Sequence, residues 1–316
     1  MLTNPASVPG MIEPIEQALL TRYAKEVDLS NGQIAVEFGA FLGRSTTCLA
    51  NGMADNPTRA TDSTLHVYDS FSCHKSDGFI KHVIAFGRSG GVENLLTIEG
   101  TKVSFLPIFQ HYLRTHIDSG IVTPHAEQLR DSAPPQAPIV LMHIDSPKFY
   151  QEFKTILFRF FPNCEQGCTI VFQDYFYHWS ASLIAAVELL HERGILEFEE
   201  SAASSLAATL TRTPCRAELL EIDLEMQSRR SIADLLTKAT AQSVARCSDR
   251  PQVFGPRVQL ALVQNLFELG DTERAATEFK SLISKHSPLP SQLLGDFLEL
   301  LGNGFSIRAL YDRDHD

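Results

Sequence analysis

The sequence predicts an α/β protein with a doubly wound, mostly parallel β-sheet, followed by a helical extension. From Ile34 to Glu192, apolar strand-like runs alternate with helix-like segments, and this rhythm requires a parallel sheet with right-handed crossovers. Two alternating segments, Ile195 to Glu199 and Ala207 to Thr213, predict a β-hairpin at the sheet edge. After about Arg216 only helical patterns remain.

Composition excludes several classes of protein. The 316 residues, 44% of them hydrophobic, suffice for one large domain, alone or with a smaller appendage. A net charge of −11 argues against binding to nucleic acid or to an anionic membrane. Residues 1–5 show no signal-peptide pattern, and no apolar run approaches the roughly 20 residues of a membrane span.

Cysteine usage fits a reducing, cytoplasmic location. Six cysteines are scattered through the chain, and the only close pair is Cys164 and Cys168. Because this pair lacks the second ligand pair of a zinc site, we interpret it as two core thiols around a turn.

The first strand leads into a glycine turn. An apolar run from Ile34 to Val36 is followed by Glu37, by Gly39 and Gly43, and then by a helix from about Ser45. The pattern predicts a buried strand, a tight turn and a helix whose N-cap is Ser45 or its neighbour Thr46. In open α/β sheets, ligands bind outside the carboxyl end of such a strand.

The turn matches neither common phosphate-binding loop. It has no Lys-Ser/Thr pair after its last glycine, and it lacks the G-x-G-x-x-G fingerprint. The pattern E-x-G-x-x-x-G-x-S instead resembles motif I of class I S-adenosylmethionine-dependent methyltransferases. That cofactor carries an ammonium group, which Glu37 could meet directly or through water. The alternative is a glycine turn that serves packing alone. The resemblance implies cofactor contacts from Glu37, Gly39, Ala40, Gly43 and Ser45.

A second strand, Leu65 to Asp69, ends in an acid. A carboxylate at this place can accept hydrogen bonds from both ribose hydroxyls of an adenosine cofactor, with Ser70 beside it; the alternative is an ordinary turn residue. Residues 70–118 are too long for a simple crossover. Their glycine-rich first half suggests either a mobile lid or a plain surface loop, before a helix from Val103 to Ile117.

A short third strand is expected from Ile121 to Pro124, and Thr123 to Glu127 lies where an adenine ring would be contacted.

Two further strands end in aspartates. They are Ile139 to Asp145 and Cys168 to Asp174, and they should be neighbours. Asp145 and Asp174, with an amide oxygen from Gln173, could then hold Mg²⁺. The alternative is that one carboxylate caps a helix and the other bonds its own turn.

Two histidines compete as proton acceptors. His143 lies on a buried strand, where a satisfied core histidine is expected. His178 follows Tyr175 to Tyr177 in a loop at the mouth of the site, a better place for proton abstraction near pH 6–7. Trp179 is expected to shape a substrate pocket.

Together these segments resemble the macrocin O-methyltransferase (TylF-like) group. The resemblance rests on the glycine turn, on Tyr68-Asp69-Ser70-Phe71, on His143-Ile144-Asp145 and on Gln173-Asp174-Tyr175. It implies O-methylation of a small hydroxylated metabolite, a sugar or natural product, with His143 and Asp145 near the cofactor and with Asp145, Asp174 and His178 as catalytic candidates. The chain departs from the group's pattern at Ser146, which follows Asp145, and at Gln173, which replaces an aspartate. These departures weaken the case for the divalent metal that the group uses. The alternatives are an N-methyltransferase of a small molecule or peptide and a non-catalytic interaction protein.

The chain is expected to have three parts: a helical lead-in (1–32), a catalytic domain (33–216) and a helical extension (217–316). Within the extension, one helical hairpin resembles a tetratricopeptide repeat. A single repeat cannot bury its own face, so it should pack on the catalytic domain or on a second subunit, giving a homo-oligomer such as a dimer. An independent peptide-binding array is the alternative. The apolar positions concerned are Leu262, Leu266, Phe279 and Leu282.

Overall fold

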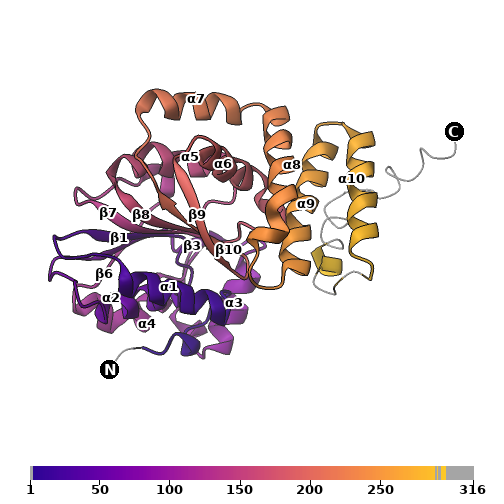
Figure 1. Cartoon of the computed structure of the whole chain (residues 1–316). Helices are drawn as coiled ribbons and strands as arrows, with labels where there is room; N and C mark the ends of the chain where they lie inside the picture. The colour runs from indigo at the N-terminus through magenta and orange to yellow at the C-terminus, as the bar shows by residue number, and fades with distance from the viewer. Residues whose placement is uncertain (1–2, 289, 291–292, 297–316) are drawn as a thin grey trace. The chain divides into compact units, whose positions relative to one another are not determined.

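The computed structural model describes residues 3–288, 290 and 293–296 (Figure 1). Within them, a seven-stranded sheet has the order β6-β2-β1-β7-β8-β10-β9, and a three-stranded sheet has the order β3-β5-β4. The strands are β1 (Ile34–Phe38), β2 (Leu65–Asp69), β3 (Ser72–His74), β4 (Thr97–Glu99), β5 (Lys102–Ser104), β6 (Val122–Ala126), β7 (Ile139–Ile144), β8 (Cys164–Phe172), β9 (Leu196–Ala202) and β10 (Ser205–Leu210).

Helices alternate with these strands along the chain and follow the last of them. The α-helices are α1 (Pro14–Glu26), α2 (Arg44–Ala54), α3 (Ile80–Ser89), α4 (Leu106–Asp118), α5 (Tyr150–Arg159), α6 (Ala181–Glu192), α7 (Arg216–Met226), α8 (Arg229–Arg246), α9 (Pro251–Glu268) and α10 (Thr272–Lys285). None of the helices in the described part of the chain combines the length and apolar character that a membrane span needs.

The predicted fold class is confirmed. Strands β6, β2, β1 and β7 pair in parallel, and β9 and β10 form the antiparallel hairpin. Every residue of β1 is buried, as expected for a parallel strand covered on both faces. The fold is therefore a Rossmann-like sheet closed by a hairpin.

The chain divides into two compact units. One contains residues 1–147 and 155–171, and the other contains residues 148–154 and 172–316. The first unit holds the glycine turn and the ends of β2 and β7. The second holds the hairpin β9–β10, helix α6 and the described part of the extension, whose last residues lie outside the described ranges. The three-part division expected from sequence stays a prediction.

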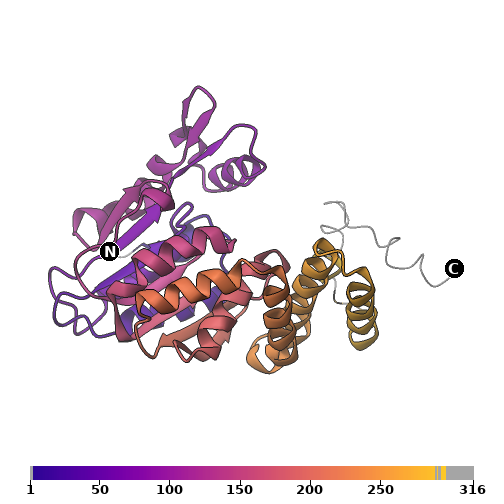
Figure 2. The same cartoon turned by 90° about the horizontal axis from the view of Figure 1, so that it is seen from above.

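The segment between β2 and α4 is folded. It contains β3, the helix α3, β4 and β5, and Figure 2 shows it standing apart from the parallel strands. Val103, expected to start a helix, instead pairs with Cys73 and Ile98 in the small sheet. The segment is therefore not a plain loop, and its role as a mobile lid stays a prediction. The expected helix begins later, at Leu106.

The cysteine pair lies on one strand. Cys164 and Cys168 are both buried in β8, and their thiols are free. The expectation of core thiols is confirmed. The expected turn between them is wrong, because the strand continues through Gly167, whose φ is +89°.

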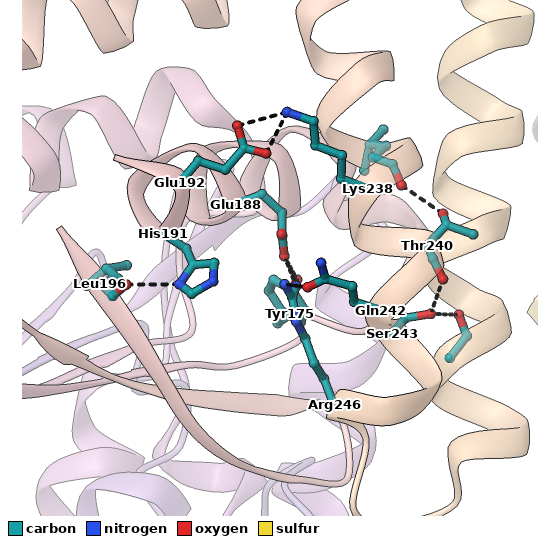
Figure 3. Close-up of polar contacts among 12 residues, drawn as sticks. Tyr175, Glu188, His191, Glu192, Leu196, Lys238, Thr240, Gln242, Ser243 and Arg246 are labelled. Atoms are coloured by element: carbon teal, nitrogen blue, oxygen red, sulfur yellow. Dashed lines mark hydrogen bonds and ion pairs between the residues drawn. The ribbon is translucent and has the colours of Figure 1, made fainter. Parts of the chain in front are cut away.

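Within the second unit, α8 is fastened to α6 by a buried charge network (Figure 3). The carboxylate of Glu188 accepts hydrogen bonds from the Tyr175 hydroxyl and the Arg246 guanidinium. The guanidinium also lies over the Phe198 ring, 4.5 Å from its centroid. Glu188 is 2% exposed, so this pair is shielded from solvent, unlike the Lys238–Glu192 pair on the same helices.

The apolar side chains of the helical hairpin α9–α10 are buried within a single chain. Leu262, Leu266, Phe279 and Leu282 are each at most 3% exposed within a single chain. These residues therefore no longer argue for a second subunit, and oligomerisation through the extension stays a prediction.

Candidate active site

Both glycines of the β1–α2 turn are required by close packing. Gly39 has φ +84°, and a Cβ atom there would lie 2.6 Å from the backbone nitrogen of Ser146. Gly43 has φ +102°, and its Cβ would lie 2.5 Å from a methyl carbon of Leu113. Left-handed backbone and lack of space both exclude larger residues, so the turn is held tightly against the chain that follows β7.

The predicted helix cap is wrong. Gly43 is the N-cap of α2, and neither Ser45 nor Thr46 caps the helix. The Thr46 hydroxyl instead donates to Glu37 Oε2 at 2.5 Å, and the Thr47 hydroxyl donates to the Gly43 carbonyl at 2.7 Å. The hydroxyl groups of Thr46 and Thr47 thus donate hydrogen bonds to buried oxygen atoms instead of capping the helix.

The structure pairs two residues expected to contact the cofactor. Glu37 and His143 lie opposite each other on β1 and β7, and His143 Nδ1 is 3.0 Å from Glu37 Oε1. Both side chains are fully buried. The Glu37 carboxylate is thus surrounded by Thr46 and His143, as expected of a buried charge. Its contact with an ammonium group stays a prediction.

Asp69 holds the glycine turn against the end of β2. Its Oδ2 atom accepts hydrogen bonds from the amides of Ala40 and Phe41 at 2.9 and 3.0 Å. Its Oδ1 atom accepts from the Phe71 amide at 2.6 Å. Burial raises the pKa of Asp69 to about 6, against the opposing effect of these amides. The side chain remains partly exposed. Its contact with the ribose hydroxyls stays a prediction, and its observed role is to hold the turn.

Two aromatic residues at this edge have strained backbone. Phe41 has φ +49° and Phe71 has φ +46°, and such outliers cluster at functional sites. The Phe41 ring packs against Phe79 and Phe86, with centroid distances of 5.2 and 5.7 Å. The folded segment after β2 is therefore in direct contact with the glycine turn.

A cavity of about 220 Å³ begins at Ser70, the residue after the end of β2. It is lined by Ser70 and by Ala126, which lies in the segment expected near an adenine ring. Lys102 and Ser104 also line it. Sequence reasoning missed these last two, because they belong to a three-residue strand with no strong pattern; the only signal was the unusual length of the segment.

The strand end after β8 is occupied by hydrogen bonds. Lys148 Nζ lies 2.6 Å from Asp174 Oδ2. The Gln173 amide donates to the Ser204 hydroxyl at 3.2 Å and accepts from the Ser205 hydroxyl at 2.8 Å. The Asp174 carboxylate therefore contacts an ammonium group, and the Gln173 amide oxygen already accepts a hydrogen bond from a hydroxyl group.

The expected metal ligands fall in two different units, so their joint binding of Mg²⁺ stays a prediction. Asp145 belongs to the first unit, and its amide donates to the Phe38 carbonyl at 2.9 Å, whereas Asp174 belongs to the second. Among the described residues, no group of three or more His, Cys, Asp or Glu side chains could hold a metal ion.

His178 is more buried than its sequence context suggests. It lies in the 3₁₀ helix η5 (His178–Ser180) and is 3% exposed, so its expected position in a loop at the mouth of the site is wrong. Burial lowers the pKa of His178 to about 4; Arg257 lowers it further and Asp296 opposes the shift. The ionisation expected near pH 6–7 is therefore moved to about pH 4. Trp179 stacks on Tyr177 at 4.1 Å.

The glycine turn after β1, the acid at the end of β2 and the hairpin beyond β8 define the architecture of class I methyltransferases. Comparison with known proteins agrees. Residues 36–175 match the family model described as "Methyltransferase domain". This match, over less than half of the chain, supports an enzyme with a methyltransferase domain.

Solved structures with the same kind of fold include the O-methyltransferase NovP, at 18% identity, a TM-score of 0.47, and coverage of 64% of this chain and 82% of that chain. CalS11, described as a TDP-rhamnose 3'-O-methyltransferase of calicheamicin biosynthesis, has 17% identity, a TM-score of 0.44, and coverage of 61% and 77%. An O-methyltransferase from Bacillus cereus, solved with SAH, has 11% identity, a TM-score of 0.35, and coverage of 65% and 85%. The search of curated proteins found no match.

Proposed function

We propose that the protein transfers a methyl group from S-adenosylmethionine to a hydroxyl oxygen of a small metabolite, a sugar or natural product. The observation that carries this proposal is the match of residues 36–175 to a methyltransferase domain. The matched segment contains the hydrogen bonds by which Asp69 joins the glycine turn to the end of β2. The cavity lined by Ser70 and Ala126 supports this proposal as a candidate site for the adenosine part of the cofactor. The choice of oxygen rests on the resemblance of the strand ends to the macrocin O-methyltransferase group.

Calorimetry tests the cofactor directly. The full chain should bind S-adenosylmethionine with one saturable site, and Asp69→Ala should weaken that binding, because it removes the acceptor for the amides of the turn. No heat at millimolar cofactor would reject the enzyme and favour an interaction protein. Screening of hydroxylated and amine acceptors by mass spectrometry then distinguishes O-methylation from N-methylation.

The route of proton removal gives a second test. With Lys148 on Asp174, we expect activity to survive EDTA. A metal-dependent enzyme would instead lose activity in EDTA and recover it with Mg²⁺, and Asp145→Asn and Asp174→Asn would each remove most of it. If His178 is the base, the rate should be flat across pH 6–7 and fall only toward pH 4, because the neutral imidazole is held by burial. His178→Ala would then abolish turnover.

A cytoplasmic location and a homo-oligomeric state also stay predictions. Sedimentation of the full chain measures the oligomeric state.

A further inference from the structure

A second cavity lies entirely within the second unit. Its volume is about 200 Å³, which corresponds to roughly seven water molecules at about 30 Å³ each. Its walls come from the η5–α6 corner, through His178 and Trp179, and from α8 and α9, through Arg229, Gln264 and Asn265. No residue of the glycine turn contributes to it.

Three residues of this wall carry buried polar atoms without a hydrogen-bond partner among the described residues. The atoms are Nδ1 of His178, Oε1 of Gln264 and Oδ1 of Asn265. The exposed fractions are 3% for His178 and 9% for Asn265. A buried polar group left without a partner costs about 1–3 kcal/mol, and such groups are rare in folded proteins. Three around one cavity therefore indicate that an occupant supplies the missing hydrogen bonds.

The chemistry of the wall defines this occupant as a donor. The Gln264 amide nitrogen already donates to Glu268 Oε1 at 3.2 Å, which leaves its oxygen as an acceptor. Asn265 contributes a second carbonyl oxygen, and Glu268 adds a carboxylate at the rim. Hydroxyl groups can donate to all of these acceptors.

The charges and the apolar surface of the cavity wall indicate more closely which class of ligand it binds. Arg229 and Glu268 both line the cavity, so their charges offset each other; Arg229 Nη1 also donates to the Glu268 carbonyl at 3.2 Å. A neutral ligand fits this balance. Phe149, which is 62% exposed, and Trp179 add aromatic surface that suits the C–H face of a ring.

We propose that this cavity binds a neutral, polyhydroxylated molecule the size of one sugar ring. The buried amide oxygens of Gln264 and Asn265 accept hydrogen bonds from its hydroxyls, and Trp179 contacts its apolar face. Of the residues that line the site, only Phe149 belongs to the matched methyltransferase segment, residues 36–175.

Trp179 provides a local probe, because it is the only tryptophan in the sequence. Its fluorescence is recorded while the full chain, without cofactor, is titrated with D-glucose, D-galactose or myo-inositol, and with sodium phosphate as the anionic comparison. We expect a saturable change with at least one of the three polyols at millimolar concentration and none with phosphate.

Three variants sharpen the test. Asn265→Leu and Gln264→Leu should each raise the apparent Kd at least tenfold. Arg230→Ala, which changes an exposed neighbour of Arg229 outside the cavity, should leave the Kd unchanged. Gln264 is only partly buried, so its variant remains informative if Asn265→Leu does not fold. The proposal would be overturned by no fluorescence change with any of the three polyols, by saturation with phosphate alone, or by an unchanged Kd in Gln264→Leu.

Discussion

Arg246→Ala is expected to lower the free energy of unfolding by about 3–5 kcal/mol, the cost of leaving one member of a buried ion pair without its partner. In the native protein, the Glu188 carboxylate accepts hydrogen bonds from both Arg246 and Tyr175. Loss of the guanidinium leaves a charge that is 2% exposed. Urea unfolding followed by circular dichroism measures the loss.

The matched control is Lys238→Ala, on the same helix. Lys238 pairs with Glu192 at 2.7 Å, with side chains 56% and 35% exposed, and such surface pairs contribute about 0–1 kcal/mol. The double variant Arg246→Met, Glu188→Leu should recover part of the loss, because it removes both charges. Equal losses for Arg246→Ala and Lys238→Ala would show that the Glu188 charge is not isolated by burial.

The Arg246 network also bears on the site. Tyr175 directly follows Asp174, whose φ is +61°, and the Tyr175 hydroxyl is 3.3 Å from Arg246 Nη1. The helical extension thus fixes the residue next to a catalytic candidate. This gives the extension a structural role within one chain, whether or not it also joins two chains.

The parallel strands β1, β2 and β7 were predictable from the sequence because they are mostly apolar runs. Leu65–Asp69 matches the expected strand, and β7 ends one residue before Asp145. The hairpin β9–β10 was found from alternation alone, with shifted ends. Burial on both faces makes such runs long and unambiguous.

Other features depend on contacts between distant residues, and no local pattern reports them. The strands β3, β4 and β5 have three residues each, too few for a periodic signal. Gln264 and Asn265 lie within an ordinary helical pattern, and only tertiary packing brings them to the cavity with His178. The Glu37–His143 pair was within reach of sequence reasoning, because adjacent strands β1 and β7 place these residues in register.

The glycine turn gives the last and most specific prediction. Gly39→Ala should destabilise the protein more than Gly120→Ala, although both positions have a left-handed backbone, with φ +84° and +74°. A non-glycine residue in this conformation costs about 1–2 kcal/mol. At Gly120 nothing lies within 4 Å of the added Cβ, so only this cost applies.

At Gly39 the added Cβ meets the Ser146 backbone nitrogen at 2.6 Å and its Cβ at 2.8 Å. The chain after β7 must then move, which adds about 1–3 kcal/mol, as for other overpacked sites. Because the amides of Ala40 and Phe41 follow directly and bind Asp69, the shift should also weaken S-adenosylmethionine binding at least tenfold, whereas Gly120→Ala binds normally. Urea unfolding and calorimetry on the two variants separate these effects. Equal stability losses would mean that the turn has room for a side chain, and unchanged affinity in Gly39→Ala would place the cofactor away from this turn.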